Sequence, residues 1–203
     1  MHSKFEILRL LSYRMCLNRL KNIGFEYVFS YYLGEEVDVS PEQIRRDLAS
    51  FGIRGKKKSG YHIEQLILDI EKILGNEGRQ FVIIVGMGNI GNALIDNDDF
   101  KRNNIDIIAG FDIDPVKLKR KYQIPVFPNN KLEEFIHSNN IKTAVLAVPA
   151  LSAQEVCNNL VSYGIRGILN FAPVNLKVED NIVLNNVNLC SELTSVIYLA
   201  NHS

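Results

Sequence analysis

The sequence lacks the features that announce a membrane protein, a metal-binding domain or a redox-active thiol pair. No apolar run approaches the roughly 20 residues of a membrane-spanning helix, and the N-terminus has no basic segment followed by an apolar core. Cysteine is scarce: there are three, Cys16, Cys157 and Cys190, without Cys-x-x-Cys spacing. We therefore expect buried, reduced thiols, no metal site and a cytoplasmic location with no membrane partner.

The chain also has no net charge, because its 23 Lys and Arg residues balance its 23 Asp and Glu residues. A neutral total does not indicate a nucleic-acid partner, so any such partner must be inferred from local clustering of charge. What is present is ordinary for a soluble globular protein, since 46% of the 203 residues are hydrophobic and 23% are charged. That length suits one large domain or two small ones.

The most informative stretch is an apolar run, residues 81–85, that leads directly into Gly-x-Gly-x-x-Gly at Gly86, Gly88 and Gly91. A continuous apolar run rich in β-branched residues indicates a strand buried on both faces of a parallel sheet. The first glycine permits a tight turn, the second lets the backbone approach a pyrophosphate, and the third lets the next helix pack closely. The pattern predicts a dinucleotide-binding turn, with a purely structural glycine turn as the alternative.

Carboxylates follow the next apolar run. Residues 105–111 lead into Asp112 and Asp114. In dinucleotide-binding folds a carboxylate at this place holds the ribose diol, and its charge disfavours a 2′-phosphate, so we favour NAD(H) over NADP. The spacing leaves open which of the two aspartates holds the diol.

Strands and helices alternate through the rest of the chain. Apolar runs at 143–149 and 167–173 flank a helical pattern at 153–163, which predicts an α/β fold with a Rossmann-type doubly wound parallel sheet. Ligands bind at the carboxyl ends of such strands, so the residues ending these two runs should border the nicotinamide side of the pocket. The predicted cofactor-binding residues are Gly86, Gly88, Asn89, Ile90, Gly91, Asp112, Asp114, Val148, Pro149, Asn170 and Phe171.

The first third of the chain predicts three helices followed by a basic hairpin. The third helix is the clearest, because Ser40-Pro41-Glu42-Gln43 combines an N-cap serine, a proline at the first position and a capping-box glutamine. Between residues 41 and 60 there are six Lys or Arg residues against two acids. This pattern predicts a winged helix-turn-helix domain that binds double-stranded DNA. The alternative is a solvated basic loop beside a structural helix bundle.

The second half of the chain offers little for catalysis. Its candidate acid or base, His137, lies near a predicted helix end and is interpreted as a surface residue. No substrate domain follows the predicted sheet. We therefore predict a transcription factor that senses a dinucleotide rather than an enzyme, with an NAD-dependent oxidoreductase as the weaker reading.

Several motifs together resemble the Rex redox-sensing repressors over nearly the whole chain. They are the glycine turn, Gln43-Ile44-Arg45-Arg46-Asp47-Leu48, Phe111-Asp112-Ile113-Asp114-Pro115 and the run from Gly164 to Pro173. The resemblance implies a homodimer whose C-terminal helix is swapped, a pocket for NADH and NAD, and release from operator DNA when NADH binds. It assigns Arg45 and Arg46 to the major groove and the wing to the minor groove. The predicted DNA-binding residues are Ser40, Gln43, Arg45, Arg46, Lys56, Lys57 and Lys58.

The chain departs from the family at the positions that couple cofactor to DNA. Family members usually carry an Arg, a Tyr and an Asp that link to one another, and this chain has Met15, Asn97 and Asn188 there. The aromatic residue that usually follows that Asp is Leu189, and the usual Arg-Gly of the wing is Lys57-Lys58. A relative that has lost NADH sensing, or that responds to coenzyme A or another adenine nucleotide, is therefore the alternative.

These patterns divide the chain into three segments. We predict a winged-helix domain over residues 1–77, a Rossmann-type domain over 78–186 and a C-terminal dimerisation helix over 187–203. The boundary rests on Gly75-Asn76-Glu77-Gly78, which is typical of a linker. The last helix carries an apolar stripe that needs a cover, from a partner subunit or from its own domain.

Overall fold

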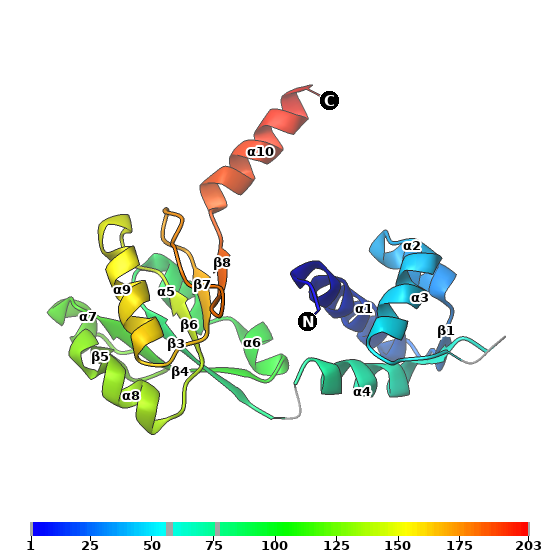
Figure 1. The fold of residues 1–203 in the computed structure, drawn as a ribbon, viewed down its shortest axis with the longest axis horizontal. Coiled ribbons are helices and arrows are strands. Elements are labelled where there is room, and N and C mark those ends of the chain that lie inside the picture. The colour runs from blue at the N-terminus through cyan, green and yellow to red at the C-terminus, as the bar shows by residue number, and fades with distance from the viewer. Residues whose placement is uncertain (1, 56–58, 76–77, 203) are drawn as a thin grey trace. The chain divides into compact units, whose positions relative to one another are not determined.

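The computed structural model describes residues 2–55, 59–75 and 78–202 (Figure 1). The chain separates into two compact units, Met1–Gly78 and Arg79–Ser203. The first is helical with a small hairpin, and the second is built on a sheet. Within the described residues, no helix has the length and apolar character needed to cross a membrane.

Four helices pack around one core in the first unit. Helix α1 begins with a reciprocal capping box, in which the Ser3 hydroxyl accepts from the Glu6 N–H and the Glu6 carboxylate accepts from the Ser3 N–H. Strands β1 and β2 pair antiparallel. The elements are α1 Lys4–Asn22, β1 Tyr27–Val28, α2 Ser30–Val37, α3 Pro41–Ser50, β2 Tyr61–His62 and α4 Ile63–Ile73.

The core of this unit is aliphatic and draws on every helix. Leu10 and Leu17 of α1, Leu33 of α2, Ile44 of α3 and Ile70 of α4 are fully buried in one cluster. Helix α2 continues to Val37 and ends there, because Asp38 adopts a left-handed conformation.

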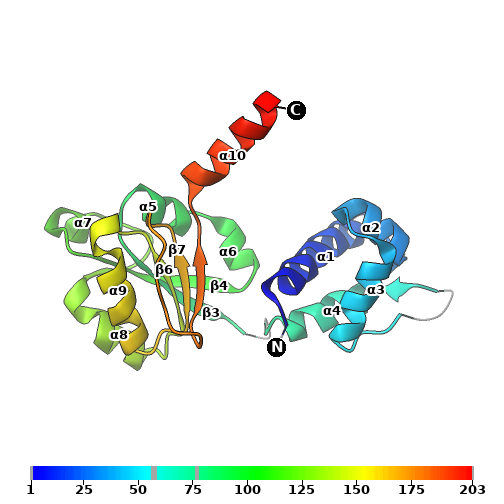
Figure 2. The ribbon, with the colours of Figure 1, turned by 45° about the horizontal axis from the view of Figure 1, so that its top comes forward.

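The second unit is a six-stranded parallel sheet in the order β5-β4-β3-β6-β7-β8 (Figure 1 and Figure 2). All five strand pairs are parallel, so each connection crosses over through a helix or loop. The strands are β3 Gln80–Val85, β4 Ile105–Asp112, β5 Val126–Pro128, β6 Thr143–Leu146, β7 Gly167–Asn170 and β8 Val183–Asn186. The helices are α5 Asn89–Ile95, α6 Asp98–Arg102, α7 Pro115–Lys119, α8 Leu132–Ser138, α9 Ala150–Ser162 and α10 Leu189–His202, with a 3₁₀ turn η1 Asn129–Lys131. This confirms the predicted doubly wound α/β fold.

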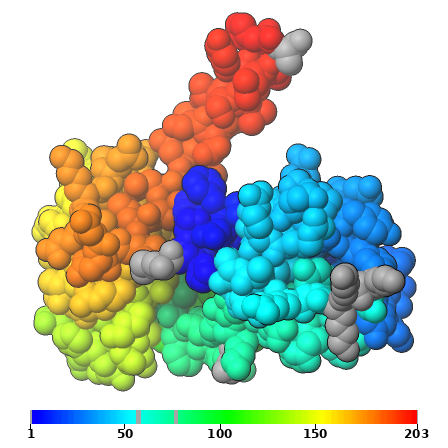
Figure 3. Space-filling view, turned by 45° about the vertical axis from the view of Figure 1, so that its right-hand side comes forward, coloured from blue at the N-terminus to red at the C-terminus, as the bar shows by residue number. Residues whose placement is uncertain are grey.

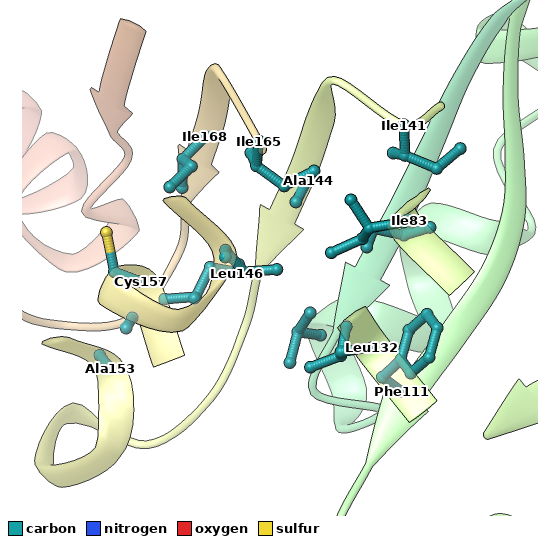
Figure 4. Close-up of a cluster of buried hydrophobic side chains, with 14 of the residues drawn as sticks. Ile83, Phe111, Leu132, Ile141, Ala144, Leu146, Ala153, Cys157, Ile165 and Ile168 are labelled. Carbon is teal, nitrogen blue, oxygen red and sulfur yellow. The ribbon is translucent and has the colours of Figure 1, made fainter. Parts of the chain in front are cut away.

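Helices cover both faces of the sheet. Alternate residues of β3 point to opposite sides: Ile83 and Val85 join the cluster under α8 and α9, whereas Val82 and Ile84 join the cluster that contains Ile95 of α5. Figure 4 shows the first cluster, with side chains from the strands meeting those of α8 and α9. Burial on both faces explains why β3 is apolar at consecutive positions.

Some elements differ from expectation. Strand β8 and helix α6 were not predicted from the sequence. Cys16 and Cys157 are buried as expected, but Cys190 is exposed on α10. That thiol therefore does not belong to a core.

Helix α10 buries no residue. Its apolar side chains are all more than half exposed, and Figure 3 shows the helix, in red, with its surface uncovered on the visible face. They are Leu189, Leu193, Val196, Ile197, Tyr198 and Leu199. Apolar exposure of this kind on one element marks a candidate interaction surface.

Candidate nucleotide pocket and nucleic-acid interface

The glycine turn connects β3 to α5, and two of its glycines cannot carry a side chain. Gly86 has a positive φ of 102°, and a Cβ there would collide with the carbonyl oxygen of Ala147. A Cβ at Gly91 would collide with the carbonyl oxygen of Gly86. At Gly88, by contrast, a Cβ would meet no atom within 4 Å. The turn thus combines close helix packing with an open backbone at its centre.

Asp112 ties the end of β4 to this turn. Its Oδ2 accepts hydrogen bonds from the Met87 N–H at 2.7 Å and from the Lys117 ammonium at 2.9 Å. Its Oδ1 accepts from the Asp114 N–H at 2.9 Å. Burial alone raises the pKa of the Asp112 carboxyl, but these hydrogen bonds outweigh burial and hold the pKa below its usual value. Asp112 is therefore ionised, and both of its carboxylate oxygens already accept hydrogen bonds from neighbouring groups.

Asp114 is the more available of the two carboxylates. One oxygen caps α7 by accepting from the Val116 N–H at 2.9 Å. The side chain is half-buried rather than buried, and it lines the cavity described next.

A cavity of about 490 Å³ lies at the carboxyl ends of the strands. Its lining comes from residues that end or follow β3, β4, β5, β6 and β7. It lies at the point where the strand order reverses, which is where doubly wound sheets bind ligands. The lining residues are Gly86, Gly88, Ile90, Asp112, Ile113, Asp114, Lys117, Asn129, Ala147, Val148, Pro149, Ser152, Val156, Phe171 and Pro173. Its size is in the range of small-molecule sites.

Eight of the predicted cofactor residues are in this lining, and three are not: Asn89, Gly91 and Asn170. Asn89 is exposed at the start of α5, and Gly91 packs against Gly86. Asn170 is fully buried, with its amide donating to the Val174 carbonyl and to Asn186 and accepting from the Ala172 N–H. It fixes the turn after β7 and does not face the cavity.

Sequence reasoning missed several lining residues. Lys117 stands five positions after Asp112, one turn into α7, and the spacing of a cation after the carboxylate was a usable signal. Asn129, Ser152 and Val156 carry no comparable signal, because only the fold brings them to this edge. Among the described residues, no group of three His, Cys, Asp or Glu side chains is arranged to hold a metal ion.

Helix α3 carries the predicted DNA-reading residues. Ser40 caps it by accepting from the Gln43 N–H at 3.2 Å, and Pro41 occupies its first position. Ile44 and Leu48 are fully buried on one side, which leaves Arg45 and Arg46 on the exposed side. The helix therefore presents both arginines to solvent, as a recognition helix requires.

The two arginines differ in their partners. Arg45 donates to Glu42 at 2.7 Å and to the Ser30 hydroxyl at 2.8 Å. Arg46 donates to the Gln43 side-chain oxygen at 3.0 Å. One guanidinium is thus paired with a carboxylate and the other with a neutral amide.

The base of the predicted wing is formed by β1 and β2. Gly60 has a positive φ of 70°, and a Cβ there would collide with the Val28 carbonyl oxygen. The backbone just before β2 therefore lies very close to the backbone of β1. The predicted wing lysines, Lys56, Lys57 and Lys58, lie outside the described residues.

Two family models match the chain. The model described as "CoA binding domain" covers residues 78–174, and the one described as "Putative DNA-binding protein N-terminus" covers residues 3–49. The redox-sensing transcriptional repressor Rex of Listeria monocytogenes is 37% identical over 94% of this chain and 89% of its own length. The chain belongs to the Rex family. Rex of Brevibacillus brevis is 38% identical over 97% of this chain and 95% of its own, and Rex 1 of Thermotoga maritima is 40% identical over 91% and 89%.

Solved structures of a Rex-family repressor, RSP, match the chain throughout. The complex of RSP with β-NAD⁺ and operator DNA gives a TM-score of 0.94 at 34% identity, covering 100% of this chain and 94% of that one. The complex with β-NADH gives 0.88, covering 100% and 95%. These Rex relatives are named as repressors rather than enzymes, in agreement with the expectation of a non-catalytic protein.

Two of the three residues at the positions where this chain departs from the resemblance to Rex make local hydrogen bonds. Asn97 caps α6 by accepting from the Asp99 N–H at 2.9 Å. Asn188 accepts from the Ser191 N–H at 3.0 Å at the start of α10. Met15 lies on α1 with 70% of its surface exposed. None of the three side chains carries a charge.

Proposed function

We propose that this chain is a transcriptional repressor that binds operator DNA through α3 and the following wing, and that binds NAD(H) in the cavity of its second unit. The observation that carries the proposal is the full-length similarity to a repressor solved with both β-NAD⁺ and operator DNA. Reduction of the bound cofactor would change the affinity for DNA, because a ligand shifts an equilibrium by its difference in affinity for the two states.

The DNA-binding role is supported by the exposed side of α3. Arg45 and Arg46 have the chemistry to read guanine edges in a major groove, and Gln43 lies beside them. Ser40, at the N-terminus of the same helix, is placed to contact a phosphate. We assign Lys56, Lys57 and Lys58 to phosphate or minor-groove contacts, from the sequence and family membership alone.

The cofactor-binding role is supported by the open turn and the cavity beside it. Gly88 leaves room for a pyrophosphate to approach the backbone, and Asp114 is placed to hold a ribose hydroxyl. Val148, Pro149 and Phe171 form an apolar wall on the far side of the turn. We assign NAD(H) as the ligand.

We further propose a homodimer formed through α10, whose large apolar side chains are not buried by the described residues of its own unit. The segments 1–77, 78–186 and 187–203 would then be the DNA-binding, cofactor-binding and dimerising parts. We place the protein in the cytoplasm, where operator DNA is accessible to a bacterial repressor.

The test is fluorescence anisotropy with an operator selected by the wild-type chain from a random duplex pool. Arg46→Ala should weaken operator binding by about 1–3 kcal/mol with little change on random DNA. Lys72→Ala, an exposed charge on α4, is the matched control and should leave operator binding unchanged. NADH added to the complex should release DNA at lower concentration than NAD⁺. Failure of both cofactors at millimolar concentration would remove the sensing role and leave the DNA-binding role.

A second candidate function is favoured by the three uncharged residues. Because Met15, Asn97 and Asn188 offer no ion pair, the redox response would be weaker, and the chain would bind DNA constitutively or respond to another adenine nucleotide. Coenzyme A is the first to try, given the family model that matches residues 78–174. Release by coenzyme A, but not by NADH, would favour this alternative.

A further inference from the structure

One carboxylate lies at the centre of a side-chain network between α1 and α3. Asp47 is 2% exposed and accepts two hydrogen bonds from Arg9, at 2.6 and 2.7 Å, in a bidentate pair. It also accepts from the Tyr13 hydroxyl at 2.6 Å and from the Gln43 amide at 2.5 Å. A buried carboxylate is tolerated only when it is paired and hydrogen-bonded, and this one has four donors.

The ionisation states in this network are well defined. Burial alone raises the pKa of Asp47, but hydrogen bonds from Arg9, Tyr13 and Gln43 outweigh it and hold the pKa below its usual value. Burial and the bond to Asp47 raise the pKa of the Tyr13 hydroxyl, which therefore remains a donor. Asp47 is an acceptor for all of its neighbours.

This fixes the direction of the Gln43 amide. An ionised carboxylate only accepts, so Gln43 must turn its NH₂ group toward Asp47 and its oxygen away from it. Arg46 donates to that oxygen at 3.0 Å. A continuous chain of hydrogen bonds therefore runs from Arg9 on α1, through Asp47 and Gln43, to the guanidinium of Arg46.

The other exposed arginine of α3 is held differently. Arg45 is paired with the carboxylate of Glu42, so part of its charge is already neutralised. Arg46 donates to a neutral oxygen and makes no direct hydrogen bond to Glu42 among the described contacts, although the Glu42 carboxylate lies near enough to act on both arginines. The two adjacent arginines therefore differ in their hydrogen-bond partners in the absence of DNA, a carboxylate for Arg45 and an amide oxygen for Arg46.

We propose that Arg9 and Tyr13 of α1 are positioning residues for operator reading, acting through Asp47 and Gln43 to orient Arg46, the principal base-reading arginine. Gln43 then serves as a bridge between Asp47 and Arg46 rather than as an independent reader of bases. This inference rests on the proposed DNA-binding function. It places part of the determinants of sequence specificity on a helix that carries none of the predicted DNA contacts.

The experiment is a double-mutant cycle in the full-length chain. Arg9→Lys keeps the charge opposite Asp47 but loses the planar fork that makes two parallel bonds. We expect it to weaken operator binding about threefold to tenfold, the range of one hydrogen bond, with random-sequence DNA bound as before. In an Arg46→Ala background the same change should have no further effect on operator binding.

Two further variants keep the test decisive if Arg9→Lys lowers stability. Gln43→Met preserves volume and leaves Asp47 paired with Arg9 and Tyr13, and it should also lose its effect on operator binding once Arg46 is alanine. Arg19→Lys is the matched control, because Arg19 makes an ion pair with Glu36 from the same helix α1 to α2, away from Asp47. It should leave operator affinity unchanged.

The possible results distinguish failure of the positioning role from failure of the proposed DNA-binding function. Effects of Arg9→Lys and Arg46→Ala that simply multiply, or an equal loss from Arg19→Lys, would overturn the positioning role and indicate general stability instead. A wild-type chain that selects no sequence from the pool would overturn the proposed function itself, and this inference with it. Thermal denaturation of every variant establishes that folded protein is compared throughout.

Discussion

Exchanging Gly91 for alanine should loosen the packing of α5 on β3, whereas the same exchange at Gly88 should leave the folded chain intact. At Gly91 the new methyl group would collide with a backbone oxygen, which cannot move aside as a side chain can. Overpacking of this kind costs about 1–3 kcal/mol. At Gly88 the φ of −82° suits any residue and no atom stands within 4 Å. There the exchange should be neutral or slightly stabilising, by up to about 1 kcal/mol.

Although Gly88→Ala should not destabilise the unliganded chain, it should weaken nucleotide binding. Its methyl group would occupy the space left for a pyrophosphate, so affinity should fall. A ligand at 100 times its dissociation constant stabilises a protein by about 2.7 kcal/mol, and a tenfold loss of affinity removes about 1.4 kcal/mol of this. Gly88→Ala should therefore keep the unliganded melting midpoint, or raise it slightly, and lose about half of the shift caused by NADH at that concentration.

The assay is thermal denaturation of wild type and both variants, with and without NADH. Gly91→Ala should lower the unliganded midpoint by several degrees. Equal unliganded midpoints for the two variants would refute the steric reasoning. A full NADH shift in Gly88→Ala would refute the placement of the ligand over the turn.

Three other changes test different parts of the chain. The pKa of Asp112 is lowered on folding, so its contribution is complete above its unfolded pKa of about 3.9 and is lost as the pH falls through the folded value. Urea denaturation should therefore show wild type more stable than Asp112→Asn at about pH 7, with the difference shrinking toward about pH 2; a constant difference would contradict this. Glu42→Gln should release Arg45 and strengthen binding to operator and random DNA alike at low salt, measured by anisotropy, and unchanged binding would show that the ion pair is irrelevant. The double variant Leu193→Glu, Ile197→Glu places two charges on the apolar side of α10 and should convert a dimer to a monomer in sedimentation velocity. A dimer that stays intact would contradict the assignment of the interface to α10.

Much of the architecture can be predicted from short, local sequence patterns. The glycine turn, the apolar run before it and the Asp112 after the next run are close in sequence and fixed by backbone geometry, so they predict a nucleotide-binding sheet directly. The cap at Ser40 likewise predicts where α3 begins. Such features depend on a residue and its near neighbours, which a sequence displays.

Other features depend on contacts between distant residues. Strand β8 has the sequence Val-Leu-Asn-Asn and is an edge strand whose backbone pairs with distant β7, a contact that its own sequence does not display. Asn170 looked like a pocket residue, but its amide is used by neighbours in the fold, including Asn186. Asp47 was read as one of the two acids in a basic stretch, and nothing local shows that Arg9 and Tyr13, more than 30 positions away, meet it.

The wall of the cavity beyond the glycine turn has a consequence for redox chemistry. The lining there carries no charged group, since it consists of Ala147, Val148, Pro149, Phe171 and Pro173. The ionic side chains of the lining, Asp112, Asp114 and Lys117, lie at the end of β4, at the N-cap of α7 and on α7. Moving a cation from water to such a surface is unfavourable, while a neutral flat ring is accepted. A pyridinium that loses its positive charge on gaining a hydride would therefore be held more firmly in its reduced form, by desolvation alone and without an ion pair to report the change.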